Sequence, residues 1–205
     1  MRLGVFGGSF DPVHFGHLLL AECCREQCAL DRVWFVPAAT APHKSDTAVT
    51  PAAARIAMLE LAIAGHGAFD VSTVEVDRGG LSYTVETLDE VRRTQPDAEL
   101  FLLLGADSLV DLASWREPAR ICELATPVVV ERPDLAPADS GPLARVVPAE
   151  VTERIERHRV EMPAVGFSSS DIRRRVAAGL SIRYRTPRAV EKYIDTHGLY
   201  RGAAK

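Results

Sequence analysis

Residues 3–17, LGVFGGSFDPVHFGH, carry the strongest structural signal in the chain. They begin with a short apolar run, residues 3–6, which is typical of a buried strand and stops at two glycines. A polar turn follows, and residues 18–30 then have the composition of a helix. A second apolar run occupies residues 32–37. The order strand, glycine turn, helix, strand predicts the βαβ unit of a parallel sheet.

The same alternation continues to the end of the chain. We expect further strands at residues 71–76, 100–104 and 128–130, shorter ones at 145–147 and 160–162, and helices at 51–64, 84–94, 118–124, 169–178 and 187–197. Residues 133–143, with several Pro, Ala and Asp, are expected to form a surface loop. The β-branched runs indicate a sheet covered on both faces. We therefore predict a doubly wound, mainly parallel α/β sheet in a single domain, residues 1–205, with its ligand beyond the carboxyl ends of the strands.

Composition excludes several classes of protein. The 205 residues are 47% apolar and 25% charged, and the net charge is only -4. A chain without a broad basic surface is not expected to wrap a nucleic acid, so any polyanion must be held by a local site. The sequence contains no run of about 18 or more apolar residues, which argues against a membrane span. Residues 1–6 do not resemble a signal peptide, and the cytoplasm is the expected location.

The cysteines are concentrated in one predicted helix, which holds Cys23, Cys24 and Cys28, while Cys122 lies apart. Neighbouring thiols on one helix do not form a disulfide framework. A metal pair at Cys24 and Cys28 remains an alternative, although no CxxC pair or nearby His completes a tetrahedral set. We therefore expect the cysteines to be small buried side chains that pack as hydrophobic residues.

The turn after the first strand is where a doubly wound fold collects phosphates. Glycines let the backbone approach a ligand closely, and a helix N-terminus offers unpaired N–H groups. His14 and His17 are three residues apart and so lie on one side of the starting helix. A metal pair and helix caps are the alternatives. No carboxylate or third histidine follows at a metal-binding spacing, so we favour phosphate contact.

Residues 7–17, GGSFDPVHFGH, resemble the GGxFDPxHxGH signature of the bacterial nicotinate-nucleotide adenylyltransferases, which belong to the HxGH nucleotidyltransferase superfamily with a Rossmann-like fold. Residues 167–173, FSSSDIR, are similar to the family's ISSTxIR motif, which binds the β- and γ-phosphates of ATP. Phe167 and Ser170 depart from that motif but keep its apolar and hydroxyl character. Serines also cap helices, whereas Arg173 adds forked donors for an anion. The helical part at about 168–200 would complete the ATP site.

Shorter elements between these motifs also match the family. The resemblance implies that Lys44 in Pro42–His43–Lys44 contacts phosphate, that Thr84 in the SYT segment contacts the pyridine nucleotide, and that Asp107 in Gly105–Ala106–Asp107 lies near the ATP ribose. Trp115 would stack on the pyridine ring, and Arg132 in Glu131–Arg132–Pro133 would lie near adenine. Arg116 stands where relatives often have an aromatic residue. An exposed Lys44, caps at Thr84 and Asp107, and a core Trp115 are the structural alternatives.

The resemblance implies transfer of AMP from ATP to nicotinate mononucleotide, giving nicotinate adenine dinucleotide and pyrophosphate for NAD biosynthesis. The attacking phosphate, with a second pKa of about 6, is already ionised, so no general base is needed. We expect His17 to stabilise the α-phosphate, His14 to position the triphosphate, and Lys44 and Arg173 to neutralise the β/γ-phosphates, with Mg2+ held by ATP and water rather than by protein ligands. The expected substrate contacts are Gly7, Gly8, Ser9, Phe10, Thr84, Gly105, Asp107, Trp115, Arg132, Ser168 and Ser169.

Other acceptors remain alternatives: nicotinamide mononucleotide, phosphopantetheine and FMN. A nucleotide-sensing module without turnover is a second class. The presence of all four expected catalytic residues argues against it: His14, His17, Lys44 and Arg173. An RNA-binding relative of the synthetases is a third class, and it lacks support because the chain has no basic surface. The sequence leaves oligomeric state open, a homo-oligomer included, and names no partner protein.

Overall fold

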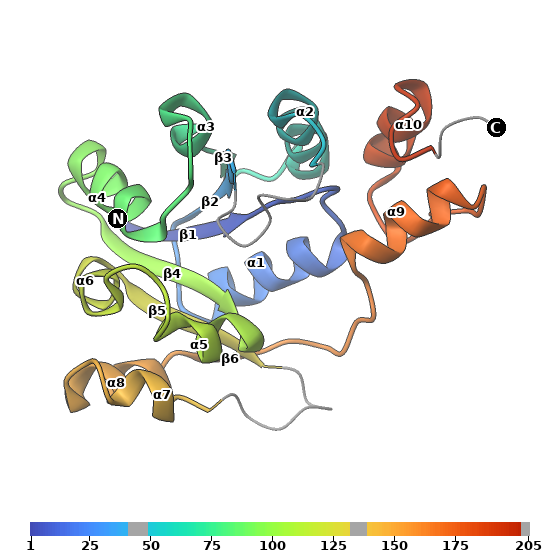
Figure 1. Ribbon diagram of the computed structural model, residues 1–205. Coiled ribbons are helices and arrows are strands. Elements are labelled where there is room, and N and C mark those ends of the chain that lie inside the picture. Colours follow the sequence, from blue (N-terminus) through green and yellow to red (C-terminus); the bar gives the residue numbers. More distant parts are fainter. Residues whose placement is uncertain (41–48, 132–138, 202–205) are drawn as a thin grey trace.

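The computed structural model describes residues 1–40, 49–131 and 139–201, and its centre in this part of the chain is a six-stranded parallel sheet (Figure 1). The strand order is β3-β2-β1-β4-β5-β6. The strands are β1 Arg2–Gly8, β2 Arg32–Pro37, β3 Phe69–Val71, β4 Glu99–Gly105, β5 Thr126–Glu131 and β6 Arg159–Glu161. The order reverses between β1 and β4, and their carboxyl ends therefore form the switch point where ligands of doubly wound sheets bind.

The helices follow the expected alternation. They are α1 Phe15–Gln27, α2 Ala52–Ile63, α3 Val74–Arg78, α4 Thr84–Thr94, α5 Ala106–Leu112, α6 Pro118–Leu124, α7 Gly141–Ala144, α8 Ala149–Glu156, α9 Ser169–Ala177 and α10 Arg188–Thr196. The last two lie beyond the carboxyl ends of β1 and β4 (Figure 1). Among the described residues, no helix is long and apolar enough to cross a membrane.

Two apolar layers sandwich the sheet, because successive side chains of a strand point to opposite faces. Along β4, Leu100, Leu102 and Leu104 pack on one side with α4, α5 and α6. Phe101 and Leu103 of the same strand pack on the other side, in the layer that also holds buried residues of α1 and α2. Ile172 of α9 and Val190 of α10 belong to this second layer, so the C-terminal helices share the core of the sheet.

Two strand predictions are wrong. The predicted strand at 71–76 covers the end of β3 and the start of α3, and acidic Glu75 and Asp77 lie in the first turn of that helix, where they complement its dipole. Residues 145–147 form the turn after α7, and Val147 is buried from that turn rather than from a strand. The helices α3, α5, α7 and α8 were not predicted, and α7 begins within the segment 133–143 that was expected to be a loop. The first helix begins at Phe15 instead of residue 18 because His14 is its N-cap.

Candidate active site

The first turn places two imidazoles at the start of α1. His14 is the N-cap residue, and its ring stacks on that of His17 with 3.7 Å between ring centroids and 18° between planes. The backbone N–H of His14 donates to Nδ1 of His17 over 3.2 Å. Because Nδ1 accepts this bond, the proton of the neutral His17 ring lies on Nε2. The cap therefore fixes the tautomer of His17 and makes Nε2–H the donor of this ring.

Phe10 lies beneath the histidines rather than beside a cavity. Its side chain is 1% exposed, and its ring meets the His17 ring edge-on with centroids 5.1 Å apart. Phe6 and Phe35 complete this aromatic packing. The structure thus gives Phe10 the position of a support for His17, and the residue lines neither of the two cavities described below.

The serine-rich segment before α9 reaches the same turn from the other end of the chain. Ser168 is the N-cap of α9 and accepts a hydrogen bond from the N–H of Asp171 over 3.1 Å. Ser169 donates to the carbonyl of Pro12 over 2.8 Å. Arg173 donates to the carbonyl of Asp11 over 2.6 Å. The two segments, more than 150 residues apart in sequence, are joined directly by these bonds.

A cavity of about 370 Å³ opens at this junction. It collects eight of the residues predicted to bind substrate or act in catalysis: Ser9, His14, His17, Gly105, Asp107, Ser168, Ser169 and Arg173. Ser9 follows β1 and Gly105 ends β4, so the cavity lies at the switch point of the sheet. Imidazole and guanidinium donors, hydroxyl groups and a helix N-terminus suit a polyanionic ligand.

A second cavity of about 230 Å³ adjoins the first. Its lining includes Gly7, Gly8, Thr84 and Trp115, and Ser9 lines both cavities. Trp115 is half-buried: it packs on the apolar layer of α4 to α6 and also lines this cavity. Two neighbouring cavities that share a serine can hold two substrates with their reacting groups side by side.

Four polar lining residues of the second cavity are absent from the predicted site residues: Glu75, Ser82, Thr87 and Ser108. The Thr87 hydroxyl donates to the buried carboxylate of Glu75 over 2.6 Å, and Arg78 donates to the same hydroxyl oxygen over 3.1 Å. The predicted strand at 71–76 included Glu75, and this wrong assignment concealed that Glu75 faces the second cavity from α3. Glu75 and Arg78 lie three residues apart on α3, whereas Thr87 belongs to α4, so no local spacing in the sequence marked the three residues as one group.

The capping alternatives are resolved at two positions. Thr84 is the first residue of α4 and Tyr83 is the N-cap. Asp107 is exposed in the first turn of α5, and the N-cap there is Gly105. Neither side chain is thus required as an N-cap. Arg116 ion-pairs with Glu86 over 2.8 Å and stacks on Tyr83. Lys44 and Arg132 lie outside the described residues.

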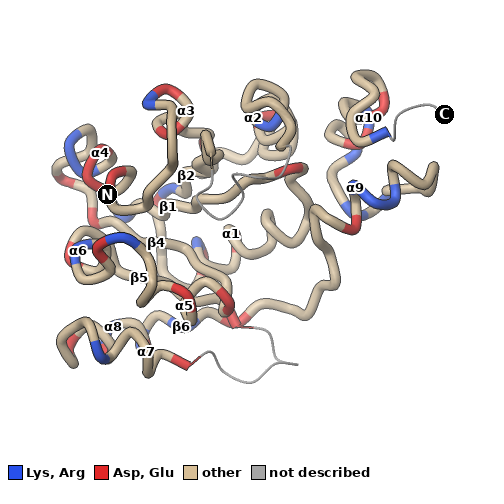
Figure 2. Tube along the Cα trace, viewed as in Figure 1, with Lys and Arg blue, Asp and Glu red and all other residues tan. Residues whose placement is uncertain are grey.

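Basic residues follow one another along α9 (Figure 2). Arg174 ion-pairs with Asp171, and Arg175 donates to the carbonyl of Ser181 over 2.8 Å. Arg185 also pairs with Asp171, over 2.8 Å. Of the arginines at 173–175, only Arg173 lines the larger of the two cavities. Among the described residues, Arg173 is thus the one arginine or lysine that lines this cavity.

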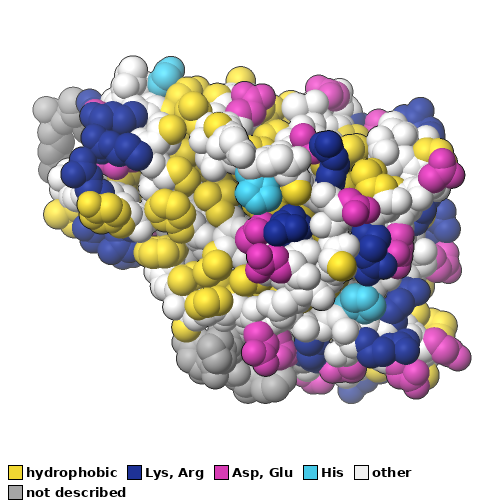
Figure 3. Space-filling model, turned by 180° about the vertical axis from the view of Figure 1, so that it is seen from behind, with side chains coloured by type: hydrophobic (Ala, Val, Ile, Leu, Met, Phe, Trp, Pro, Cys, Tyr) yellow, Lys and Arg dark blue, Asp and Glu magenta, His cyan; other side chains and the backbone are white. Residues whose placement is uncertain are grey.

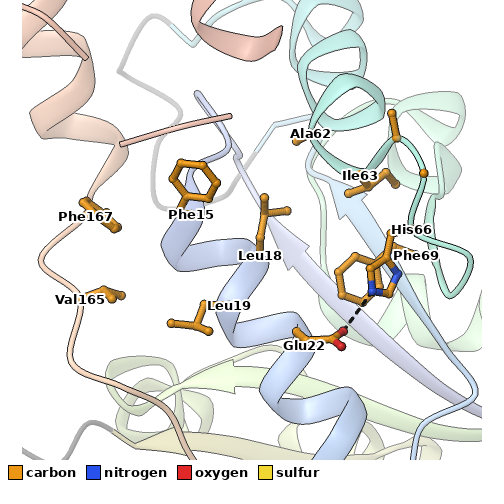
Figure 4. A pocket seen from close by; sticks show the side chains of 12 residues that line it. Phe15, Leu18, Leu19, Glu22, Ala62, Ile63, His66, Phe69, Val165 and Phe167 are labelled. Carbon is orange, nitrogen blue, oxygen red and sulfur yellow. Dashed lines mark ion pairs between the residues drawn. The ribbon is translucent and has the colours of Figure 1, made fainter. Parts of the chain in front are cut away.

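A further cavity, of about 640 Å³, lies behind the segment at 165–167 and is mostly apolar (Figure 4). Phe15, Leu18 and Phe167 point into it, and His66 pairs with Glu22 over 3.2 Å at its other end. Hydrophobic side chains gather on this rear face of the molecule (Figure 3). It contains few groups that could hold phosphate, and it shares only the segment at 165–167 with the 370 Å³ cavity.

The cysteines are thiols that pack as apolar residues. Cys24, Cys28 and Cys122 are buried and Cys23 is half-buried. Burial raises the pKa of all four thiols, that of Cys122 to about 11. These thiols are protonated near neutral pH. This supports the interpretation of the cysteines as small packed side chains over that of metal ligands, because the thiolate is the form that binds metal.

Comparisons with known proteins agree with this geometry. A family model described as cytidylyltransferase-like matches residues 5–175. A probable nicotinate-nucleotide adenylyltransferase of Thermus thermophilus is 51% identical, over 98% of this chain and 100% of the relative. A relative with the same description from Thermomicrobium roseum is 49% identical, over 98% of this chain and 92% of its own.

Solved structures show the same fold. The nicotinic acid mononucleotide adenylyltransferase of Plasmodium falciparum, complexed with NaAD, superposes with a TM-score of 0.76 at 17% identity, and 97% of each chain is covered. Full-length identity near one half, the match of the family model and the two joined motifs lead to one conclusion. The chain belongs to the cytidylyltransferase-like family and, within it, to the nicotinate-nucleotide adenylyltransferases.

Proposed function

We propose that this chain transfers AMP from ATP to nicotinate mononucleotide, with ATP in the 370 Å³ cavity and the acceptor in the 230 Å³ cavity. The products are nicotinate adenine dinucleotide, an intermediate of NAD biosynthesis, and pyrophosphate. The observation that carries the proposal is the joint lining of one cavity by His14, His17 and Arg173, next to a second cavity that shares Ser9.

The reaction needs no proton to be removed. A phosphate oxygen of the acceptor attacks the α-phosphorus of ATP, and the bond from that phosphorus to the bridging oxygen breaks. Pyrophosphate leaves with the bonding electrons. Because the acceptor phosphate, with a second pKa of about 6, is ionised near pH 7, the protein has to align two anions and disperse their charge.

Each side chain takes a role that its position supports. His17 directs its Nε2–H to the α-phosphate, since Nδ1 is engaged by the backbone. His14, stacked against it, positions the triphosphate. Arg173 neutralises the β- and γ-phosphates, and we assign the same role to Lys44. Asp107 accepts hydrogen bonds from the ribose hydroxyls, and Trp115 stacks on the pyridine ring.

Nucleotidyltransferases of this kind generally use a divalent metal with ATP, and we propose Mg2+. The ion would offset charge on the phosphate oxygens. Mg2+ beside a nucleotide is usually held by phosphate oxygens and water, and we propose that arrangement here. We also place this chemistry in the cytoplasm.

The test is a panel of acceptors with ATP and Mg2+, in which pyrophosphate release and the dinucleotide product are both measured. Nicotinate mononucleotide should give a kcat/KM at least roughly tenfold above nicotinamide mononucleotide, phosphopantetheine and FMN, a discrimination typical of a site that fits one substrate. Faster turnover of any other acceptor would reassign the substrate. Tight ATP binding without product from any acceptor would make the chain a nucleotide-binding relative.

A further inference from the structure

Hydrogen bonds from side chains of the C-terminal part of the chain to backbone carbonyls of the first turn hold these two segments together. Arg173 donates to the carbonyl of Asp11 over 2.6 Å, Ser169 to that of Pro12 over 2.8 Å, and Thr186 to that of Val13 over 2.7 Å. Three consecutive carbonyls of the turn thus receive donors from three positions in residues 169–186. The position of Arg173 in the ATP cavity therefore depends on where the Asp11 backbone lies.

The Asp11 side chain is the centre of a second set of bonds. It is 5% exposed, and its Oδ1 accepts from the hydroxyl of Tyr200 over 2.6 Å. Its Oδ2 accepts from the backbone N–H of Thr50 over 3.2 Å. A carboxylate taken out of water needs such donors, and these two come from segments on either side of the turn. One residue of the turn is therefore held through both its backbone and its side chain.

The packing and backbone conformation of Tyr200 place its hydroxyl at Asp11. Its ring packs against the core layer beneath α9 and α10, and its backbone has a φ of +61°, a left-handed conformation that is costly for a tyrosine. Burial, together with the hydrogen bond to Asp11, raises the pKa of its hydroxyl. The hydroxyl is consequently a protonated donor throughout the physiological range. The strained backbone delivers it to a carboxylate 189 positions away.

The buried side chain of Arg55 holds the same turn through the carbonyl of Ser9. It is 2% exposed and donates to the carbonyls of Ser9 over 2.9 Å, Ala38 over 2.8 Å and Thr50 over 2.8 Å. Arg55 thus holds the start of the turn to the end of β2 and to the segment before α2. Residue 9 is held by Arg55, and residue 11 is held by Tyr200. Neither Arg55 nor Tyr200 lines the ATP cavity.

We propose that Tyr200 is a positioning residue for ATP: its hydroxyl holds Asp11 so that the Asp11 carbonyl can hold the Arg173 guanidinium at the triphosphate. The proposal rests on the proposed function, because it takes the cavity of Arg173 as the ATP site. In this proposal Tyr200 acts on ATP through Asp11 and Arg173. Its loss should affect ATP, which Arg173 binds, and spare the acceptor, whose cavity Arg173 does not line.

The experiment compares Tyr200→Phe with wild type in kinetics and in ATP binding without turnover, measured by calorimetry with a non-hydrolysable analogue. Phenylalanine keeps the ring and removes only the hydroxyl. Loss of one hydrogen bond to a charged group should weaken ATP binding and raise the KM for ATP roughly five- to twentyfold. The KM for nicotinate mononucleotide should stay within about twofold, since no contact in its cavity changes.

Tyr193→Phe is the matched control, because Tyr193 is a half-buried tyrosine of α10 whose ring stacks on His197 and whose hydroxyl bonds to no described residue. It should leave both KM values unchanged. A Tyr200→Phe protein with wild-type ATP affinity, or with equal losses for both substrates, would overturn the positioning role. If wild type makes no dinucleotide, the proposed function fails, while the ATP-binding comparison still decides the role of Tyr200.

Should Tyr200→Phe fail to fold, Tyr200→His and Tyr200→Leu replace it. Histidine keeps a planar side chain with an N–H donor, and leucine has none. The positioning role requires the leucine variant to lose at least roughly threefold more ATP affinity than the histidine variant. Equal losses would show that only packing at this position matters, and would overturn the proposal.

Discussion

The backbone orients the ring of His17, the side chain that we propose to act on the α-phosphate. Its Nδ1 accepts the His14 N–H, and the edge of Phe10 supports its ring. On the proposed function, the Nε2–H donor is therefore preorganised toward the charge that develops on the α-phosphate. We predict that His17→Ala lowers kcat roughly a hundredfold or more, as does the loss of other preorganised donors to developing charge. Steady-state pyrophosphate release measures this effect.

The control for this change is His197→Ala, at an exposed histidine that ends α10. It should keep kcat within about twofold, because surface substitutions remote from a site have small effects. A His17→Ala enzyme with near wild-type kcat would remove this imidazole from the mechanism.

Arg55 is the largest of the fully buried side chains of the described residues, and it serves main-chain carbonyls rather than a carboxylate. Burial lowers its pKa from the usual value of an arginine. Arg55→Met leaves three carbonyls without their donor, and we predict a loss of about 3 kcal/mol or more in the free energy of unfolding. Urea denaturation measures it. Arg93→Met, at a 75% exposed side chain of α4, should change stability by less than about 0.5 kcal/mol.

At the scale of elements, α9 depends on its first residues. The Ser168 hydroxyl accepts from the Asp171 N–H, which would otherwise be an unpaired donor at the helix start. We predict that Ser168→Ala destabilises the protein by about 1 kcal/mol, and that Ser168→Thr, which keeps a capping oxygen, restores most of it. Thermal and urea unfolding both report this difference. Equal stability of the alanine and threonine proteins would show that the cap contributes nothing.

The elements also show what a sequence can predict. Thr84–Thr94 and Pro118–Leu124 were predicted at their observed bounds, because a double glycine precedes the first and a proline opens the second. The helix α5 was missed because it begins directly after β4, with Gly105 as N-cap and no polar break between them. Residues 71–76 alternate apolar and polar side chains over too few residues to separate a strand from a short helix.

The predicted site residues came from contiguous motifs, and the structure gathers most of them around two cavities. Contacts between distant residues were beyond reach. Nothing local marks Tyr200 as the partner of Asp11, since their contact arises from the packing of α9 and α10 on the sheet. Arg55 reads locally as one polar residue in an apolar helix, and only the fold shows the carbonyls around it.

At the scale of the whole molecule, the proposed ATP cavity is lined from both ends of the chain, whereas the lining residues of the proposed acceptor cavity all lie between Val5 and Trp115. We predict that a non-hydrolysable ATP analogue with Mg2+ slows backbone hydrogen exchange in residues 14–18 and in the first turn of α9, because it bridges these segments. Nicotinate mononucleotide alone should slow exchange near residues 84–88 and leave α9 unchanged. Protection of α9 by the acceptor alone would contradict the placement of the two substrates.

The join between residues 11–13 and the donors at 169–200 also has a consequence for how the protein is made. During synthesis the first turn leaves the ribosome early, with its carbonyls facing water instead of Ser169, Arg173 and Thr186. At roughly 5–20 residues per second, its partners follow about ten seconds or more later. A nascent chain can therefore form most strands of the parallel sheet before Ser169, Arg173 and Thr186 reach the carbonyls of the first turn. On the proposed function, the contacts with ATP are thus completed late, on a sheet that is already largely assembled.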